Sequence, residues 1–158
     1  MSASPPAPDD AALHVALIGY GEVGNIFGAA LVAGRARSVT AYDILVADAA
    51  WAVNARPRAA RDGVALARNA REAVADADLV ISAVTAAATA TAAQAIARAC
   101  RPGTFVLDVN SASPHTRTEC AEIVARAGGC YVEAAVMSSV PPHGLRAPML
   151  RRWRSRAC

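Results

Sequence analysis

The sequence contains no lysine, so all sixteen of its basic residues are arginines. This absence excludes any chemistry that needs a lysine of this chain as a general acid, a general base or a Schiff-base nucleophile. Aromatic residues are scarce as well, at 4 % of the 158 residues. We therefore expect a core built from Ala, Val, Leu and Ile, in a chain long enough for one domain.

The cysteines show no CxxC pair and no cluster with the three histidines, which argues against a zinc site. They are Cys100, Cys120, Cys130 and Cys158. Scattered cysteines predict free thiols in a reducing compartment. Residues 1–12 lack the basic and apolar regions of a signal peptide, so we expect a disordered lead-in and a cytoplasmic protein.

Charge is also limited, because the formal net charge is only +3 and much of it lies in residues 151–157. The rest of the chain is near neutral, which argues against nucleic-acid binding. The stretch from Leu79 to Ala97 has no charged residue, yet threonines interrupt it. A buried strand followed by an Ala-rich helix explains it better than a membrane span, so no membrane contact is expected.

The most informative stretch is 17–32, which reads LIGYGEVGNIFGAALV. Three glycines stand between a short apolar run and a segment with helical spacing. Gly19 permits a tight turn, Gly21 lets a pyrophosphate approach the backbone, and Gly24 allows close packing of helix on strand. A phosphate would then lie on the free N–H groups at the start of the helix.

A second apolar run, Ser38–Tyr42, ends in Asp43, roughly 20 residues after Gly24, at the place of the ribose-binding acid of dinucleotide sites. A carboxylate there can accept both ribose hydroxyls of an adenosine, which favours NAD and repels the additional phosphate of NADP. The alternative is that an arginine from the Ile44–Arg61 stretch folds back and accepts that phosphate.

Short apolar runs alternate with helical segments from His14 onward, which predicts an α/β protein of the Rossmann type. Its sheet would be doubly wound and mostly parallel, with helices on both faces. The expected strands are 14–18, 38–42, 64–67, 79–84, 104–109 and 130–136. The expected helices are 22–33, 48–55, 69–75, 86–100 and 114–127. We expect a dinucleotide-binding domain over 13–140, and a loop with a basic tail over 141–158.

Four segments together resemble the NAD(P)-binding domain of the 6-phosphogluconate dehydrogenase and β-hydroxyacid dehydrogenase family. They are LIGYGEVG, DLVISAV followed by Thr85, DVNSASP from Asp108 to Pro114, and YVEAAVMSSVPP from Tyr131 to Pro142. The resemblance implies a nicotinamide cofactor and hydride transfer to or from a small hydroxyacid-type substrate. It places the nicotinamide half of the cofactor beside the strand end at Val84 and Thr85.

The resemblance also implies which residues line the site. The expected cofactor-binding residues are Gly19, Tyr20, Gly21, Glu22, Val23, Gly24, Asp43, Val84 and Thr85. Ser111 and Asn110 are expected to bind the substrate at the carboxyl end of a strand. Ser113 can cap the helix that begins at Pro114, so this serine cluster has both a structural and a functional interpretation.

Two features depart from the family. The second substrate loop, usually D-x-P-[VM]-[ST]-G-G, reads EAAVMSS from Glu133 to Ser139, without its glycines. The family's catalytic lysine lies in a later helical domain that is absent here, and the catalytic residues are unknown. His115 and His143 are the only imidazoles near the expected cleft.

Three functions remain open on the sequence. The chain is an oxidoreductase domain of this family, a truncated cofactor-binding fragment without catalysis, or a nucleotide- or S-adenosylmethionine-binding domain of other chemistry. The family dimerises through its helical domain, so a homodimer is expected only with that domain present. Without it, Val136, Met137 and Val140 are expected to form an exposed apolar wall.

Overall fold

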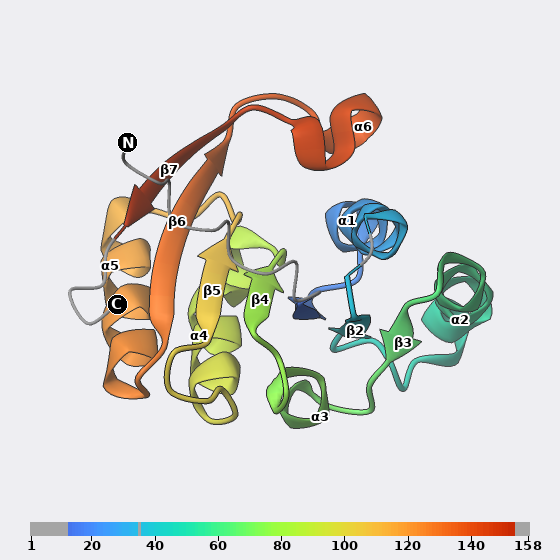
Figure 1. Cartoon of the computed structure of the whole chain (residues 1–158), viewed down its shortest axis with the longest axis horizontal. Coiled ribbons are helices and arrows are strands. Elements are labelled where there is room, and N and C mark those ends of the chain that lie inside the picture. Colours follow the sequence, from blue (N-terminus) through green and yellow to red (C-terminus); the bar gives the residue numbers. More distant parts are fainter. Residues whose placement is uncertain (1–12, 35, 154–158) are drawn as a thin grey trace, which may run out of the picture.

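The computed structural model describes residues 13–34 and 36–153. One seven-stranded sheet, in the order β3-β2-β1-β4-β5-β6-β7, forms the centre of the molecule (Figure 1). Its strands are β1 (His14–Ile18), β2 (Ser38–Tyr42), β3 (Ala65–Leu66), β4 (Leu79–Ser82), β5 (Phe105–Asp108), β6 (Cys130–Val136) and β7 (Met149–Trp153). All neighbours pair in parallel except β7, which runs antiparallel to β6. The Rossmann-type α/β fold is confirmed.

Helices connect the parallel strands, as right-handed crossovers require. They are α1 (Glu22–Ala33), α2 (Ala49–Asp62), α3 (Ala70–Val74), α4 (Thr89–Ala97) and α5 (Pro114–Arg126), with the short 3-10 helix η1 (Ala86–Ala88) before α4. The short helices α6 (Val140–His143) and η2 (Gly144–Arg146) lie between β6 and the antiparallel β7. The uncharged stretch 79–97 forms β4, η1 and α4. Within the described ranges, none of the helices combines the length and hydropathy needed to span a bilayer.

The two faces of the sheet carry separate cores. Val15 and Leu17 of β1 pack with Phe27 of α1 on one face. Ala16 and Ile18 pack on the other face, in the core to which α3, α4 and α5 contribute. Successive side chains of a strand point to opposite faces, so a strand covered on both sides reads as a continuous apolar run. This explains why the sequence shows no polar alternation in β1 and β4.

The order of the strands creates a switch point between β1 and β4. From β1 the chain winds outward through β2 to β3, and then returns to add β4, β5 and β6 on the other side of β1. The connections that leave β1 and β4 therefore diverge to opposite sides. In doubly wound sheets, ligands bind in the crevice that opens at the carboxyl ends of such strands.

Helix α2 is longer than the sequence predicts, since it continues through Pro57 to Asp62. A proline inside a helix leaves the carbonyl four residues earlier without its donor. That carbonyl belongs to Val53, and both Val53 and Pro57 are exposed, so water can replace the missing donor. The expectation that this helix ends near Ala55 was wrong for this reason.

The segment after Val136 is also more ordered than its sequence indicates. Residues 149–153 form the edge strand β7, although only a loop and a tail were expected there. Val140 begins α6, which packs with η2 against α1. Val140 is buried in the α1-side core, which corrects the expected exposed wall, whereas Met137 is 60 % exposed.

Two helix caps that the sequence predicts are present. Asn69 Oδ1 accepts a hydrogen bond from the N–H of Glu72 at 2.8 Å, at the start of α3. Ser113 Oγ accepts one from the N–H of Thr116 at 3.1 Å, at the start of α5. These caps satisfy N–H groups that have no partner inside the helix, and they fix where each helix begins.

The cysteines differ from one another in environment. Cys100 and Cys120 are free thiols, as expected, but Cys130 is disulfide-bonded, which corrects the expectation of thiols throughout. Cys120 lies on α5 and is fully buried in the core. Burial, with smaller contributions from Asp108 and Glu119, raises the pKa of the Cys120 thiol to about 11.

We expect this thiol to make the protein less stable in alkaline solution. The unfolded chain releases the Cys120 proton near its ordinary pKa of 9.0, whereas the folded chain keeps it up to about 11. Stability that is fully present below pH 9 is therefore lost as the pH rises through this window, by about 1 kcal/mol at pH 10. Urea unfolding at pH 8.5 and pH 10 checks this. The Cys120→Ala variant should lose much less stability between these two pH values than the unmodified chain. An equal loss of stability in the variant would show that other groups cause the effect.

Candidate dinucleotide-binding site

The glycine turn lies at the switch point, where β1 ends beside β4. Gly19 has a φ of +96°, and a Cβ there would stand 2.2 Å from the carbonyl oxygen of Ala83. A Cβ on Gly24 would stand 2.1 Å from the carbonyl oxygen of Gly19. Only glycine fits at either position, the first because of its backbone conformation and the close approach of β4, the second because α1 packs closely on the turn.

Gly21 differs from the other two glycines. A Cβ built on it meets no heavy atom within 4 Å, so nothing in the fold itself demands glycine. Gly21 is the N-cap of α1, and no side chain makes a capping hydrogen bond there. Among the described residues, the first turn of α1 therefore has no side-chain cap and the space beside Gly21 is open, as a bound pyrophosphate would need.

The other residues of the turn serve in different ways. The side chain of Tyr20 is fully buried, and its hydroxyl accepts a hydrogen bond from Asn25 Nδ2 at 3.2 Å. Glu22 is exposed, whereas Val23 packs against the α1-side core. Tyr20 as a whole is therefore inaccessible, and its N–H is engaged by Asp43, although its sequence position predicts a cofactor contact.

Asp43 connects the end of β2 to the glycine turn. Its Oδ2 accepts a hydrogen bond from the N–H of Tyr20 at 2.8 Å, and its Oδ1 accepts one from the N–H of Leu45 at 3.0 Å. Each carboxylate oxygen has further acceptor capacity, and the side chain is partly exposed. The carboxylate thus lies beside the turn with its orientation fixed, as a ribose-binding acid should.

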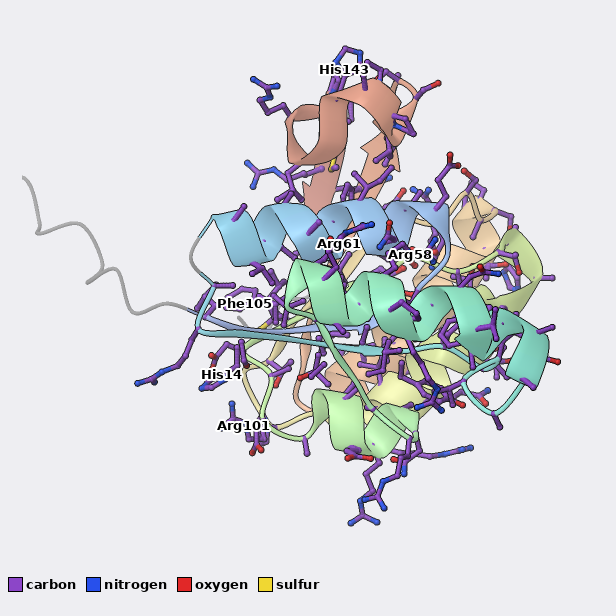
Figure 2. The ribbon with its side chains drawn as sticks, turned by 90° about the vertical axis from the view of Figure 1, so that its right-hand side faces the viewer. His14, Arg58, Arg61, Arg101, Phe105 and His143 are labelled. Atoms are coloured by element: carbon purple, nitrogen blue, oxygen red, sulfur yellow. The ribbon has the colours of Figure 1, made fainter. Side chains whose placement is uncertain are left out.

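The arginines of α2 have different neighbours. Arg56 Nη2 lies 3.5 Å from the carbonyl oxygen of Val46, in the loop that follows Asp43. Arg58 lies over the ring of Tyr20, 5.8 Å from its centroid, and Arg61 pairs with Asp62. Both arginines belong to α2 and are labelled in Figure 2. Of these three, Arg56 contacts the loop next to the expected ribose site.

The loop after β4 is held by Asn110. Asn110 Oδ1 accepts a hydrogen bond from the N–H of Val84 at 2.6 Å, and its Nδ2 donates to Ser82 Oγ at 3.0 Å. The side chain is buried. Its amide is therefore engaged inside the protein, whereas the sequence places Asn110 among the residues that contact substrate. Val84 and Thr85 lie at the carboxyl end of β4, where the nicotinamide half is expected.

The loop after β5 presents Ser111 on the surface. Ser111 is exposed, whereas Ser113 caps α5, so the structural interpretation holds for Ser113. His115, in the first turn of α5, is exposed. His143, at the end of α6, is exposed as well, and Figure 2 shows it at the outer tip of the molecule.

A buried polar network under this loop escaped the sequence analysis. The hydroxyl of Tyr131 donates to Asp108 Oδ2, and the guanidinium of Arg117 pairs with Glu133. Burial raises the pKa of Asp108, and burial together with Asp108 raises that of Tyr131. The signal was available in part, because Asp108 and Glu133 interrupt two apolar strands that pair side by side.

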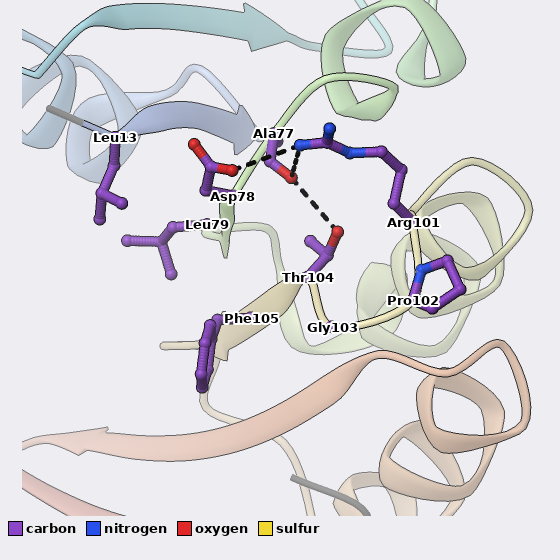
Figure 3. A pocket seen from close by; sticks show the side chains of 9 residues that line it. All are labelled: Leu13, Ala77, Asp78, Leu79, Arg101, Pro102, Gly103, Thr104 and Phe105. Carbon is purple, nitrogen blue, oxygen red and sulfur yellow. Dashed lines mark hydrogen bonds and ion pairs between the residues drawn. The ribbon is translucent and has the colours of Figure 1, made fainter. Parts of the chain in front are cut away.

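A separate hollow of about 520 Å³ lies at the other end of the strands from the glycine turn, at the amino ends of β1, β4 and β5 (Figure 3). Arg101 crosses it, and its Nη2 donates to Asp78 Oδ1 at 3.3 Å. Thr104 Oγ1 donates to the carbonyl oxygen of Ala77 at 3.2 Å. Because this hollow is at the amino edge, it is not part of the site formed by the glycine turn.

The turn, the uncapped helix start and Asp43, brought together at the switch point of a doubly wound sheet, define a dinucleotide-binding Rossmann domain. Comparison with known proteins gives the family. Residues 14–141 match the model of the NAD binding domain of 6-phosphogluconate dehydrogenase. The chain therefore belongs to the 6-phosphogluconate dehydrogenase family.

Solved structures agree with this assignment. A conserved hypothetical protein from Sinorhizobium meliloti 1021 is 33 % identical, with a TM-score of 0.84 over 90 % of this chain and 47 % of its own. The 3-hydroxyisobutyrate dehydrogenase of Mycobacterium tuberculosis is 28 % identical, with a TM-score of 0.73 over 84 % of this chain and 43 % of its own. This chain thus spans less than half the length of both. No curated protein sequence matches it.

Proposed function

We propose that the chain binds NAD across the carboxyl edge of its sheet and prefers it to NADP. The observation that carries this proposal is the fixed carboxylate of Asp43 beside a glycine turn with open space at Gly21. The adenosine ribose would lie on Asp43, and the pyrophosphate on the N–H groups that begin α1. A 2′-phosphate would meet the negative charge of Asp43, which lowers the affinity for NADP.

We further propose that the substrate is a small hydroxyacid, bound near Ser111. Ser111 is exposed and follows the carboxyl end of β5, two strands from β1, on the side of the expected nicotinamide. The nicotinamide would supply the hydride acceptor or donor. The similarity to 3-hydroxyisobutyrate dehydrogenase, solved with L-serine, supports a substrate of this class.

A second candidate function is cofactor binding without hydride transfer by the chain alone. The observation that favours it is the absence of lysine, since a lysine general acid cannot come from this sequence. His115 and His143 are both exposed, and no described residue fixes either imidazole by a hydrogen bond. Neither is held in the manner of a general acid.

Calorimetric titration of the purified chain with NADH and NADPH tests the first function. We expect saturable binding of NADH, at least about tenfold tighter than that of NADPH, because one unfavourable charge contact costs on the order of 1 kcal/mol or more. Equal affinities would contradict the role given to Asp43. No binding of either cofactor would contradict the proposed function itself.

Turnover separates the two candidates. The chain is incubated with NADH and a panel of small oxoacids, and the absorbance of NADH is followed. Oxidation of NADH that depends on an oxoacid supports the oxidoreductase. Tight NADH binding without turnover supports the non-catalytic function.

A further inference from the structure

We propose that the buried pair of Arg117 and Glu133 is the positioning element for the nicotinamide half of the site. This inference rests on the proposed function, and it adds two residues that contact neither cofactor nor substrate. The pair acts through Asn110, which connects the loop after β5 to the loop after β4. Without the pair, the adenosine half of the cofactor would still bind, but the nicotinamide half would no longer be held in a fixed position.

Asn110 is the connecting residue because all four of its polar groups are engaged. Its side chain bonds Val84 N–H and Ser82 Oγ, and its own N–H donates to Asp108 Oδ1 at 2.8 Å. Its carbonyl oxygen accepts a hydrogen bond from Arg117 Nη2 at 2.7 Å. A fully bonded buried residue has one orientation, so whatever fixes Asn110 also fixes Val84.

Arg117 also determines how the next peptide group points. In a planar trans peptide, the C=O of one residue and the N–H of the next point in opposite directions. Because the C=O of Asn110 points inward to Arg117, the N–H of Ser111 points away from the buried network. Ser111 itself is exposed. The guanidinium thereby holds the N–H of Ser111 on the side of the loop that faces away from the buried network.

Glu133 fixes the guanidinium in turn. It lies on β6 and pairs with Arg117 Nη1, and both side chains are nearly inaccessible, with 10 % and 15 % exposed. The planar guanidinium of an arginine can bond a carboxylate with one nitrogen and a carbonyl with another in a fixed geometry. The ammonium of a lysine does this less well. Helix α5, strand β6 and the loop after β5 are thus joined at one side chain.

Stability alone does not account for this pair. Removing two charges from water costs several kcal/mol, and such pairs are often replaceable by apolar residues without loss. Moreover, Arg117 Nε is buried and has no hydrogen-bond partner among residues 13–34 and 36–153. Only the two terminal nitrogens of the guanidinium, Nη1 and Nη2, are hydrogen-bonded to described residues. This arrangement holds the two groups that they contact in fixed positions, in keeping with a positioning role.

The test compares NADH with ADP-ribose, which has the adenosine half and both phosphates but no nicotinamide. We expect Arg117→Met to bind ADP-ribose as the unmodified chain does, and to lose about tenfold or more in the preference for NADH over ADP-ribose. Glu133→Gln, which keeps the size of the side chain, should lose part of the preference for NADH over ADP-ribose. Arg126→Met is the matched control, because Arg126 pairs with Glu122 on the exposed face of the same helix. It should change neither affinity.

An unchanged ratio in folded Arg117→Met or Glu133→Gln would overturn the inference. If Arg117→Met fails to fold, Glu133→Gln alone decides. Amide hydrogen exchange provides a readout without any ligand: the Val84 N–H should exchange faster in Glu133→Gln than in Arg126→Met, and equal protection would overturn the inference. Failure of the unmodified chain to bind ADP-ribose would instead contradict the proposed function, and the exchange measurement would still decide on Arg117 and Glu133.

Discussion

Replacing Asp43 with alanine is expected to weaken NADH binding by about 100-fold, or roughly 2.7 kcal/mol. Hydrogen bonds to a charged group contribute about 1.5–3 kcal/mol each, and the variant loses the acceptors for the ribose hydroxyls. It also loses the bonds that Asp43 makes to the N–H groups of Tyr20 and Leu45, so the turn is less firmly held. Calorimetric titration of both proteins with NADH measures the effect.

Asp48→Ala is the matched control for this experiment. Asp48 lies nearby in the sequence, and its Oδ1 caps α2 by accepting from the N–H of Trp51 at 2.8 Å. Its removal should cost about 1 kcal/mol of stability and leave NADH binding unchanged. Asp43→Asn can keep only one of the two backbone hydrogen bonds, because its amide nitrogen cannot accept one, and it should narrow the preference for NADH over NADPH. NADH affinity in Asp43→Ala equal to that of the control would show that the ribose does not lie there.

We expect Gly24→Ala to lower the stability of the fold, and Gly21→Ala to lower the affinity for NADH. Gly24→Ala places a Cβ 2.1 Å from a backbone oxygen, which no rotamer change can relieve, and it should destabilise the fold by about 3 kcal/mol or more. Gly21→Ala meets nothing within 4 Å, so its stability should stay within about 0.5 kcal/mol. Its new methyl group points into the space proposed for the pyrophosphate, and binding of NADH should fall by tenfold or more.

Each glycine variant is the control for the other. Thermal unfolding gives the stability of both, and titration with NADH and ADP-ribose gives the binding of Gly21→Ala. Both ligands should be weakened alike, because both contain the pyrophosphate. Unchanged binding in a folded Gly21→Ala protein would refute the proposed path of the phosphates, and a fully stable Gly24→Ala protein would refute the close contact of α1 with the turn.

The fold was accessible from the sequence because its signals are local. A strand covered on both faces must be apolar throughout, and a tight turn that touches its neighbour requires Gly19. Asn69 and Ser113 mark the starts of two helices because their side chains satisfy nearby N–H groups. The caps join residues three positions apart, whereas the buried strands and Gly19 show their tertiary surroundings through residue type alone.

The parts that the sequence missed depend on distant partners. Strand β7 exists because β6 offers a free edge, and Val140 is buried because α1 lies against it. Helix α2 passes Pro57 because that face of the helix meets water. None of these conditions is visible in the local pattern, which shows only loop-like or helix-breaking residues.

The site divides in the same way. The sequence by itself determined the glycine turn, the acid at Asp43 and the order of strands and helices, since each leaves a signal of residue type and spacing in the chain. Only the tertiary structure decided that Asn110 turns inward and that Arg117 meets Glu133. Those contacts join residues from different strands and a helix, and the free energy of burying a charged pair depends on groups that only folding brings together.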